Sequence, residues 1–274
     1  MQSRSAAPPA ATSRLVRAYR LLRLIAHLVR GLATVGLVFP FVGSERQLAI
    51  IRRWSRGLLR ALNVKLHVVG TPPGGHVPTL VVTNHVSWLD IWVIHAVCPV
   101  RFVAKSDVRR WPVLGWLVTR AGTIYIERAR RHDTGRTNRH IVEVLSRGER
   151  VGVFPEGTTT DGTHLRPFHA SLFQPALGAG ARVVCAAIRY PLRNDGPNPD
   201  VAYTGERSLL ASLRLILAQR RLRAELIFCG VLDPVGKTRR DLARESHRLI
   251  AHALRLSHRG TEPETADGPP DAAP

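Results

Sequence analysis

A histidine and an aspartate five residues apart are the strongest candidates for acid–base chemistry. Residues 84–90 read NHVSWLD and follow the apolar run TLVVT, which is typical of a buried strand. On one regular helix the side chains of His85 and Asp90 would point about 140° apart and could not meet. Ser-x-x-Asp before an apolar run instead predicts a helix with Ser87 as N-cap and Asp90 in its first turn.

From the loop before that helix, the His85 ring can turn back toward Asp90. A carboxylate bonded to one imidazole nitrogen fixes the tautomer and leaves the other nitrogen free to act as a base. The alternative is that Asp90 only supports the helix N-terminus and that His85 is an ordinary loop residue.

A second polar turn follows another predicted strand. Residues 149–158 read ERVGVFPEGT, which places Glu156 and Thr158 at the end of a strand, where ligands bind in open α/β sheets. Gly157 would let a ligand approach the main chain closely. The turn lacks the Gly-Lys-Ser/Thr of a P-loop. A plain Pro/Gly turn is the alternative interpretation.

A third candidate is the arginine that ends the segment GTIYIER, residues 122–128. Arg128 could hold a phosphate through two parallel hydrogen bonds. It could equally pair with Glu127 or with Glu156.

The elements that must position these residues begin after residue 63. Strand and helix patterns alternate there, which predicts an α/β fold with a mixed, largely parallel sheet covered by helices, over residues 63–256. The predicted strands are 65–70, 79–85, 100–105, 122–128, 149–158, 181–191 and 224–234. The predicted helices are 87–97, 111–121, 134–149, 208–221 and 237–256.

Residues 14–62 are predicted to be a pair of membrane-associating helices. Residues 14–43 alternate arginine with leucine and end in thirteen residues without a charge, fewer than the roughly 20 that a span needs. A span starting at Leu24 would contain Arg30. Inserting that arginine would cost roughly 2.5–3.5 kcal/mol of free energy if it lay at the bilayer centre. An interfacial or re-entrant anchor, a full span and a helix packed on the protein's own core therefore remain open. A second amphipathic helix is predicted over 47–62.

The chain ends and the composition set further bounds. Residues 1–13 and the acidic segment 257–274 are predicted to be disordered, and no secretory signal peptide is expected. The formal net charge is +20, and 37 of the 40 basic residues are arginine, which either reflects coding bias or favours phosphate-bearing partners. Three widely spaced cysteines exclude a disulfide scaffold, fit a reducing compartment and make a zinc site an unfavoured interpretation.

The motifs together resemble the glycerolipid acyltransferase family, whose best-known members are the bacterial 1-acylglycerol-3-phosphate acyltransferases. They occur in the family's order over residues 80–191, and a segment at 102–115 also falls where family members have one. The resemblance covers residues 24–256. It rests on Asn84-His85-x4-Asp90, Gly122–Arg128, Phe154–Thr158 and the strand-to-proline segment 181–191.

The resemblance implies a reaction and its site. His85 would be the general base on a lysolipid hydroxyl, oriented by Asp90, and the hydroxyl would attack the thioester of acyl-CoA or acyl carrier protein directly. Lysophosphatidic acid would become phosphatidic acid. The headgroup would be held by Lys105, Arg128, Glu156, Gly157 and Thr158. No metal or redox cofactor is implied. The bilayer is the expected partner, at the cytoplasmic side of the bacterial inner membrane.

Two departures from the family pattern leave the acceptor open. Glu127 stands where the family usually has aspartate, and Thr159-Thr160-Asp161-Gly162 stands where Arg-Ser often follows Glu-Gly-Thr. Members resembling lyso-ornithine lipid acyltransferases also carry Glu-Gly-Thr-Thr, so a lyso-ornithine or other lyso-aminolipid is the alternative acceptor.

Two other classes of function are remote alternatives. A basic nucleic-acid-binding protein should show a recognisable reading element or an aromatic platform, and aromatic residues make up only 6% of the chain. A lipid hydrolase built on His85 and Asp90 is disfavoured because the sequence has no Gly-x-Ser-x-Gly elbow.

Overall fold

The computed structural model describes residues 12–106, 109, 114–126 and 131–256, and the strands among them form one seven-stranded sheet. Its order is β1-β7-β6-β2-β5-β3-β4. The strands are β1 (Val64–Val69), β2 (Thr79–Thr83), β3 (Arg101–Lys105), β4 (Ile124–Ile126), β5 (Arg150–Val153), β6 (Arg182–Arg189) and β7 (Leu222–Leu232).

Strand direction brings the candidate segments to one edge of this sheet. The neighbours from β6 through β2, β5 and β3 to β4 all pair in parallel, so their carboxyl ends share an edge. β7 pairs antiparallel to β6 and parallel to β1. The predicted mixed, largely parallel sheet is confirmed, and the segments after β2, β4, β5 and β6 are the ones that carry the sequence motifs.

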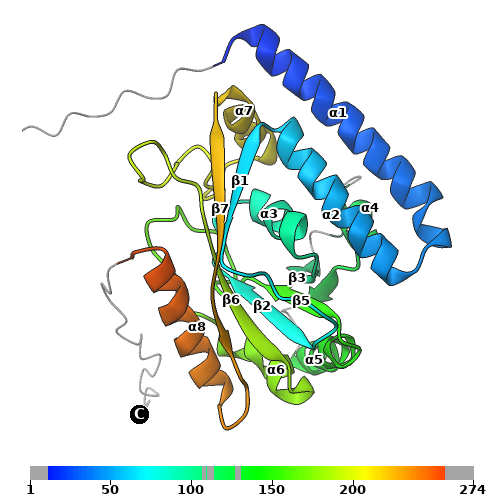
Figure 1. Cartoon of the computed structure of the whole chain (residues 1–274), viewed down its shortest axis with the longest axis vertical. Coiled ribbons are helices and arrows are strands. Elements are labelled where there is room, and N and C mark those ends of the chain that lie inside the picture. The colour runs from blue at the N-terminus through cyan, green and yellow to red at the C-terminus, as the bar shows by residue number, and fades with distance from the viewer. Residues whose placement is uncertain (1–11, 107–108, 110–113, 127–130, 257–274) are drawn as a thin grey trace, which may run out of the picture.

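Helices cover both faces of the sheet (Figure 1). α2 (Ser44–Ala61), α3 (Leu89–Val97) and α7 (Leu209–Ala218) pack on one face, and α5 (Arg131–Ser146), α6 (Gln174–Ala179) and α8 (Arg239–Ala253) on the other. Alternate strand residues serve the two cores, because successive side chains of a strand point to opposite faces. Val81 of β2 faces the first core, whereas Leu80 and Val82 face the second.

The N-terminal helix α1 (Arg14–Leu37) packs along α2, and two aromatic side chains each hydrogen-bond to the backbone of the other helix. His27 Nε2 lies 2.9 Å from the Trp54 carbonyl oxygen, and Trp54 Nε1 donates to the His27 carbonyl oxygen at 3.2 Å. A side chain at Gly31 would collide with Trp54, so this contact requires glycine. The Arg20 guanidinium donates to the carbonyl oxygens of Leu217 and Gln219, which fixes α1 to the end of α7.

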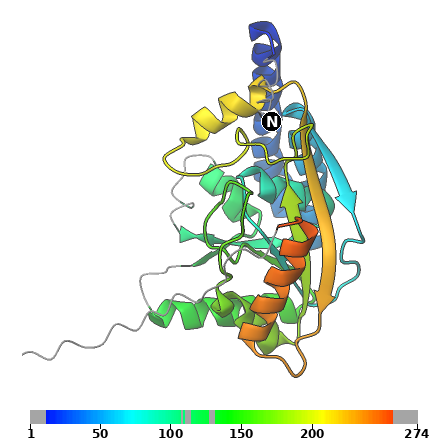
Figure 2. The ribbon, with the colours of Figure 1, turned by 90° about the vertical axis from the view of Figure 1, so that its left-hand side faces the viewer.

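The opposite face of α1 is apolar and exposed. Its large exposed side chains include Leu15, Leu22, Ile25 and Val29, each at least 49% exposed. The segment Arg14–Phe41 is long and apolar enough to cross a membrane, and only 28% of its most apolar stretch is buried inside the protein. Figure 2 shows that the first turns of α1 extend beyond the sheet. One face of α1 thus packs on the protein, with Leu24 in the core, while the other face is apolar and exposed, so the anchor, the span and the helix packed on the core all stay open as interpretations of this segment.

The structure corrects several predicted boundaries. Thr12 and Ser13 were assigned to a disordered N-terminus, but Thr12 donates to the Ala218 carbonyl oxygen and Ser13 caps α1. The short helices η3 (Ala170–Phe173) and α6 were not predicted. α4 (Leu114–Arg120) occupies part of the predicted helix 111–121. Residues 1–11 and 257–274 lie outside the described part of the chain.

Candidate active site

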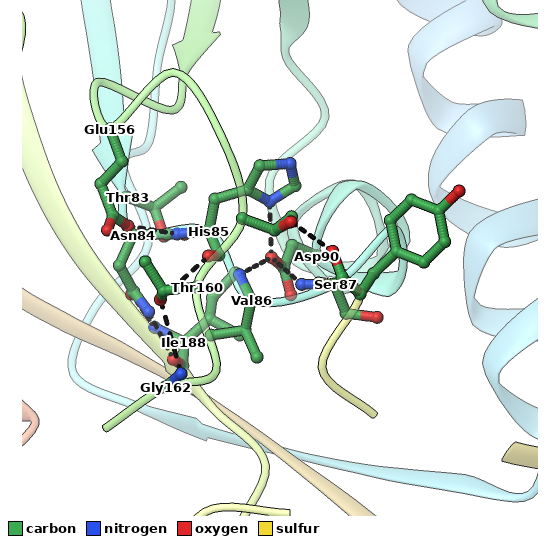
Figure 3. A network of polar contacts seen from close by, with 12 residues as sticks. Thr83, Asn84, His85, Val86, Ser87, Asp90, Glu156, Thr160, Gly162 and Ile188 are labelled. Atoms are coloured by element: carbon green, nitrogen blue, oxygen red, sulfur yellow. Dashed lines mark hydrogen bonds and ion pairs between the residues drawn. The ribbon is translucent and has the colours of Figure 1, made fainter. Parts of the chain in front are cut away.

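The His85 ring and the Asp90 carboxylate meet at the carboxyl end of β2. His85 Nδ1 lies 2.8 Å from Asp90 Oδ2 (Figure 3). Asp90 is fully buried, whereas the His85 side chain is 19% exposed. Because an ionised carboxylate only accepts hydrogen bonds, Nδ1 carries the proton and Nε2 of the neutral ring holds a free lone pair. The predicted meeting of the two side chains is confirmed.

The same carboxylate also binds the backbone just before helix α3. Asp90 Oδ2 accepts hydrogen bonds from the backbone N–H groups of Val86 at 2.7 Å and Ser87 at 2.9 Å. The predicted Ser87 cap is wrong, because α3 begins at Leu89 without a side-chain cap and the buried Ser87 hydroxyl has no hydrogen-bond partner among the described residues. Asp90 lies in the first turn of α3, as predicted, and its carboxylate reaches back to the N–H groups that precede the helix, which is the other half of a capping box.

Two neighbouring segments hold the backbone on either side of His85. The Asn84 side chain donates to the Ile188 carbonyl oxygen at 2.9 Å and accepts from the Ile188 N–H at 2.8 Å, so it continues the pairing of β2 with β6. Thr160 N donates to the His85 carbonyl oxygen at 2.8 Å. Figure 3 shows these contacts around the loop. The histidine therefore sits on a backbone that is fixed at two points.

Glu156 holds the same loop from the turn after β5. Its Oε1 accepts from the His85 N–H at 2.8 Å (Figure 3), and its Oε2 accepts from the Arg166 N–H at 2.9 Å. Burial raises the pKa of the Glu156 carboxyl, and the two backbone donors oppose that rise. The structure thus gives Glu156 a role in positioning the loop, while its predicted contact with an acceptor headgroup stays a prediction.

A stack of aromatic rings fixes the plane of the imidazole. The rings of His85 and Phe154 stack with centroids 3.9 Å apart and planes inclined by 15°. Phe102 lies on the far side of Phe154 at 5.3 Å, almost parallel to it. An aromatic face also attracts a cation, so this stack stabilises the imidazolium that forms when His85 accepts a proton.

The remaining predicted ligands lie along this edge or outside the described residues. Gly157 has a left-handed φ of +69° in the turn after β5, and Thr158 is exposed. Lys105 ends β3, but its side chain is not described. Arg128 and Glu127 lie outside the described part of the chain. The structure therefore brings His85, Asp90, Glu156 and the 157–158 turn together and leaves the arginine untested.

Several contacts of the site were not predicted from the sequence, and the one that reaches Asp90 comes from the end of β6. Tyr190 donates from its hydroxyl to Asp90 Oδ1 at 2.6 Å, and it is buried. One hundred residues separate the two, and no spacing rule connects them. The available signal was the parallel pairing of β2 with β6, which places the ends of both strands side by side.

The arrangement can remove a proton from a bound alcohol. A neutral imidazole with a carboxylate on Nδ1 accepts a proton at Nε2, and the carboxylate stabilises the resulting imidazolium. No described residue hydrogen-bonds to Nε2, so that nitrogen is open to a substrate. Among the described residues, no group of three or more His, Cys, Asp or Glu side chains gathers as metal ligands would.

Known proteins resemble this chain both in sequence and in fold. A family model described as Acyltransferase matches residues 65–189. The lyso-ornithine lipid O-acyltransferase of Pseudomonas aeruginosa is 38% identical over 88% of this chain and 93% of that protein. The 1-acyl-sn-glycerol-3-phosphate acyltransferase of Neisseria meningitidis serogroup B is 41% identical over 71% and 78%, respectively. The crystal structure of the acyltransferase PlsC from Thermotoga maritima, at 19% identity, covers 90% of this chain and 97% of its own with a TM-score of 0.66.

The solved structure establishes the fold, and the two sequence relatives establish the family. The chain belongs to the acyltransferase family. It is an O-acyltransferase, so the class of enzyme predicted from the ordered motifs is confirmed.

Proposed function

We propose that the enzyme transfers a fatty acyl group from acyl-CoA or acyl carrier protein to the free hydroxyl of lysophosphatidic acid and so forms phosphatidic acid. The observation that carries this proposal is the 2.8 Å contact between His85 Nδ1 and Asp90 Oδ2, which leaves Nε2 open. The Neisseria relative is named for this activity.

In the proposed reaction, Nε2 of His85 takes the proton of the acceptor hydroxyl while the hydroxyl oxygen attacks the thioester carbonyl carbon. The tetrahedral intermediate then collapses, the C–S bond breaks, and the leaving sulfur takes the proton back from the imidazolium. Asp90 stabilises the charged ring throughout. Neither an acyl-enzyme nor a metal or redox cofactor takes part in this proposal.

We assign the acceptor headgroup to the turn after β5, which lies beside the His85 loop. Gly157 and Thr158 follow the loop-holding Glu156, and Lys105 ends the neighbouring strand β3. Arg128 is the proposed phosphate ligand, because a guanidinium binds phosphate oxygens through paired hydrogen bonds.

A second candidate acceptor is lyso-ornithine lipid, and the carboxylate of Asp161 favours it. A cavity of about 240 Å³ beside the catalytic loop is lined by Val86, Asp161 and Gly162 among others. The Thr163 hydroxyl lowers the pKa of Asp161, whose side chain is 50% exposed. An ionised, accessible carboxylate suits the ammonium group of an ornithine headgroup. The Pseudomonas relative is named for that acceptor.

An assay of the purified full-length enzyme with both acceptors distinguishes the two candidates. With acyl-CoA, we expect acylated product from lysophosphatidic acid. If lyso-ornithine lipid is also a substrate, Asp161→Asn should lower its kcat/KM about tenfold, because one charged hydrogen bond is lost, without slowing the phosphate acceptor. Asp233→Asn is the control, since that exposed carboxylate only accepts from the Val235 N–H. Equal losses with both acceptors would contradict a headgroup role for Asp161, and free fatty acid as the product would contradict the transferase.

We also propose that α1 holds the enzyme on the cytoplasmic face of the bacterial inner membrane, where a lysolipid resides. Its exposed apolar face supports bilayer contact, and the free cysteines Cys98, Cys185 and Cys229 fit the reducing cytoplasm. The arginine excess is then assigned to lipid and phosphate contacts rather than to nucleic acid.

Charged residues on the exposed face of α1 should release the enzyme from membranes. The double variant Leu22→Glu/Ile25→Glu removes two apolar side chains worth roughly 1.5–3 kcal/mol each in lipid contact. We therefore expect at least about a hundredfold weaker partition into anionic vesicles, measured by flotation. Val235→Glu is the control, because it places a charge at a residue that is 82% exposed, in the turn between β7 and α8 at the end of the molecule away from α1 (Figure 1). Unchanged flotation of the α1 variant would remove this helix from membrane binding.

A further inference from the structure

Tyr190 ties the end of β6 to the catalytic pair. It follows directly after β6, is 3% exposed, and its hydroxyl donates to Asp90 Oδ1 at 2.6 Å. Asn84 binds the same strand two residues earlier through Ile188. The position of Tyr190 against Asp90 is therefore set by the sheet.

The two oxygens of Asp90 have different partners. Oδ2 accepts from His85 Nδ1 and from the N–H groups of Val86 and Ser87, whereas Oδ1 accepts from Tyr190. Hydrogen bonds to a buried carboxylate are short and strong. Burial, and then the nearby Asp90 charge, raise the pKa of the Tyr190 phenol well above its usual range, so the phenol stays protonated and can only donate to this carboxylate.

We propose that Tyr190 is a positioning residue for the transfer reaction. Its hydroxyl fixes the rotation of the Asp90 carboxylate, which keeps Oδ2 on His85 Nδ1, and it withdraws part of the negative charge from that carboxylate. Tyr190 does not touch the substrate and acts through Asp90. This inference rests on the proposed role of His85 as general base.

Loss of the Tyr190 hydroxyl should move the acid limb of the pH–kcat profile to higher pH. Without its donor, Asp90 carries more negative charge and holds a proton on the imidazole more strongly, and Asp90 itself also takes up a proton more readily. Both effects raise the pH at which the active, unprotonated base forms. Among the described residues, the titratable groups that face the pair are Tyr190 from the end of β6 and Glu156 from the turn after β5.

The test is Tyr190→Phe in the purified full-length enzyme. We expect kcat to fall about 10- to 100-fold, the effect of losing one hydrogen bond to a charged group, while KM for both substrates stays within about twofold. The acid limb of the pH–kcat profile should move to higher pH. Tyr19→Phe is the matched control, because it also removes one phenol hydroxyl, at a residue of α1 that is 60% exposed, and it should change neither kcat nor the profile.

A second measurement does not depend on turnover. Titration of the His85 ring by NMR should show a higher midpoint in Tyr190→Phe than in the parent enzyme, so the inference can be judged even if the proposed reaction fails. If Tyr190→Phe does not fold, 3-fluorotyrosine at position 190 keeps the hydroxyl, makes it a stronger donor and should move the midpoint to lower pH. An unchanged midpoint and pH profile in a folded variant would overturn the proposal, as would a loss of kcat that only follows a smaller folded fraction.

Discussion

Replacing His85 with alanine should abolish acyl transfer and leave the protein folded. The variant loses the nitrogen that accepts the hydroxyl proton, and general-base catalysis contributes about 10²- to 10⁴-fold to such reactions. The fold should survive, because the loop stays fixed through backbone contacts to Glu156 and Thr160 that do not involve the imidazole. Product formation from acyl-CoA and the lysolipid, measured beside circular dichroism and thermal unfolding, checks both statements.

His76→Ala is the matched control for that experiment. His76 is 78% exposed and lies on the segment before β2, at the other end of the strand from the catalytic loop. It should keep full activity. Near-normal turnover by a folded His85→Ala variant would exclude the imidazole as the base.

Asp90→Asn should lower activity about 10²- to 10⁴-fold and also destabilise the protein. An asparagine has one acceptor oxygen in place of two, so its amide nitrogen must face a group that now donates to Asp90. If that group is His85 Nδ1, the ring changes tautomer and Nε2 no longer accepts a proton. If it is Tyr190 or a backbone N–H, a buried donor loses its partner, and the free energy of unfolding falls by about 1.5–3 kcal/mol. Steady-state kinetics and denaturant unfolding measure the two effects.

A double variant shows whether Asp90 acts through His85. Once His85 is alanine, the further change Asp90→Asn should not slow residual transfer, since residues that work as a unit are not additive. Asp233→Asn, which alters an exposed carboxylate, should leave both rate and stability unchanged. Multiplicative losses in the double variant would mean that Asp90 contributes to catalysis independently of His85.

The sheet and the pairing of His85 with Asp90 could be predicted because both depend on short-range patterns. Alternating strand and helix segments forced a covered sheet, and a histidine in the loop before a helix can reach a carboxylate in that helix's first turn. The parallel order of β6, β2, β5, β3 and β4 then placed the motifs at one edge. The resemblance to the acyltransferase family added the reaction, which residue spacing alone left open.

The contacts that tighten the site could not be predicted because they join distant segments. Tyr190 reaches Asp90, and Asn84 pairs with Ile188, only after β6 has docked beside β2. The Ser87 hydroxyl does not cap α3, because the helix begins at Leu89 and Asp90 holds the Ser87 N–H from within the first turn. Thr12 is held by Ala218 at the end of α7, 206 residues along the chain, so the composition of the N-terminal segment gave no sign of that contact.

The release of free CoA with and without acceptor tests the central claim most directly. If the alcohol attacks the thioester itself after His85 removes its proton, CoA should appear only when the lysolipid is present, in equal amount to the acylated lipid, and His85→Ala should release none. A burst of CoA in the absence of acceptor, or CoA in excess of the lipid product, would show that an acyl-enzyme or water takes the acyl group and would contradict direct transfer.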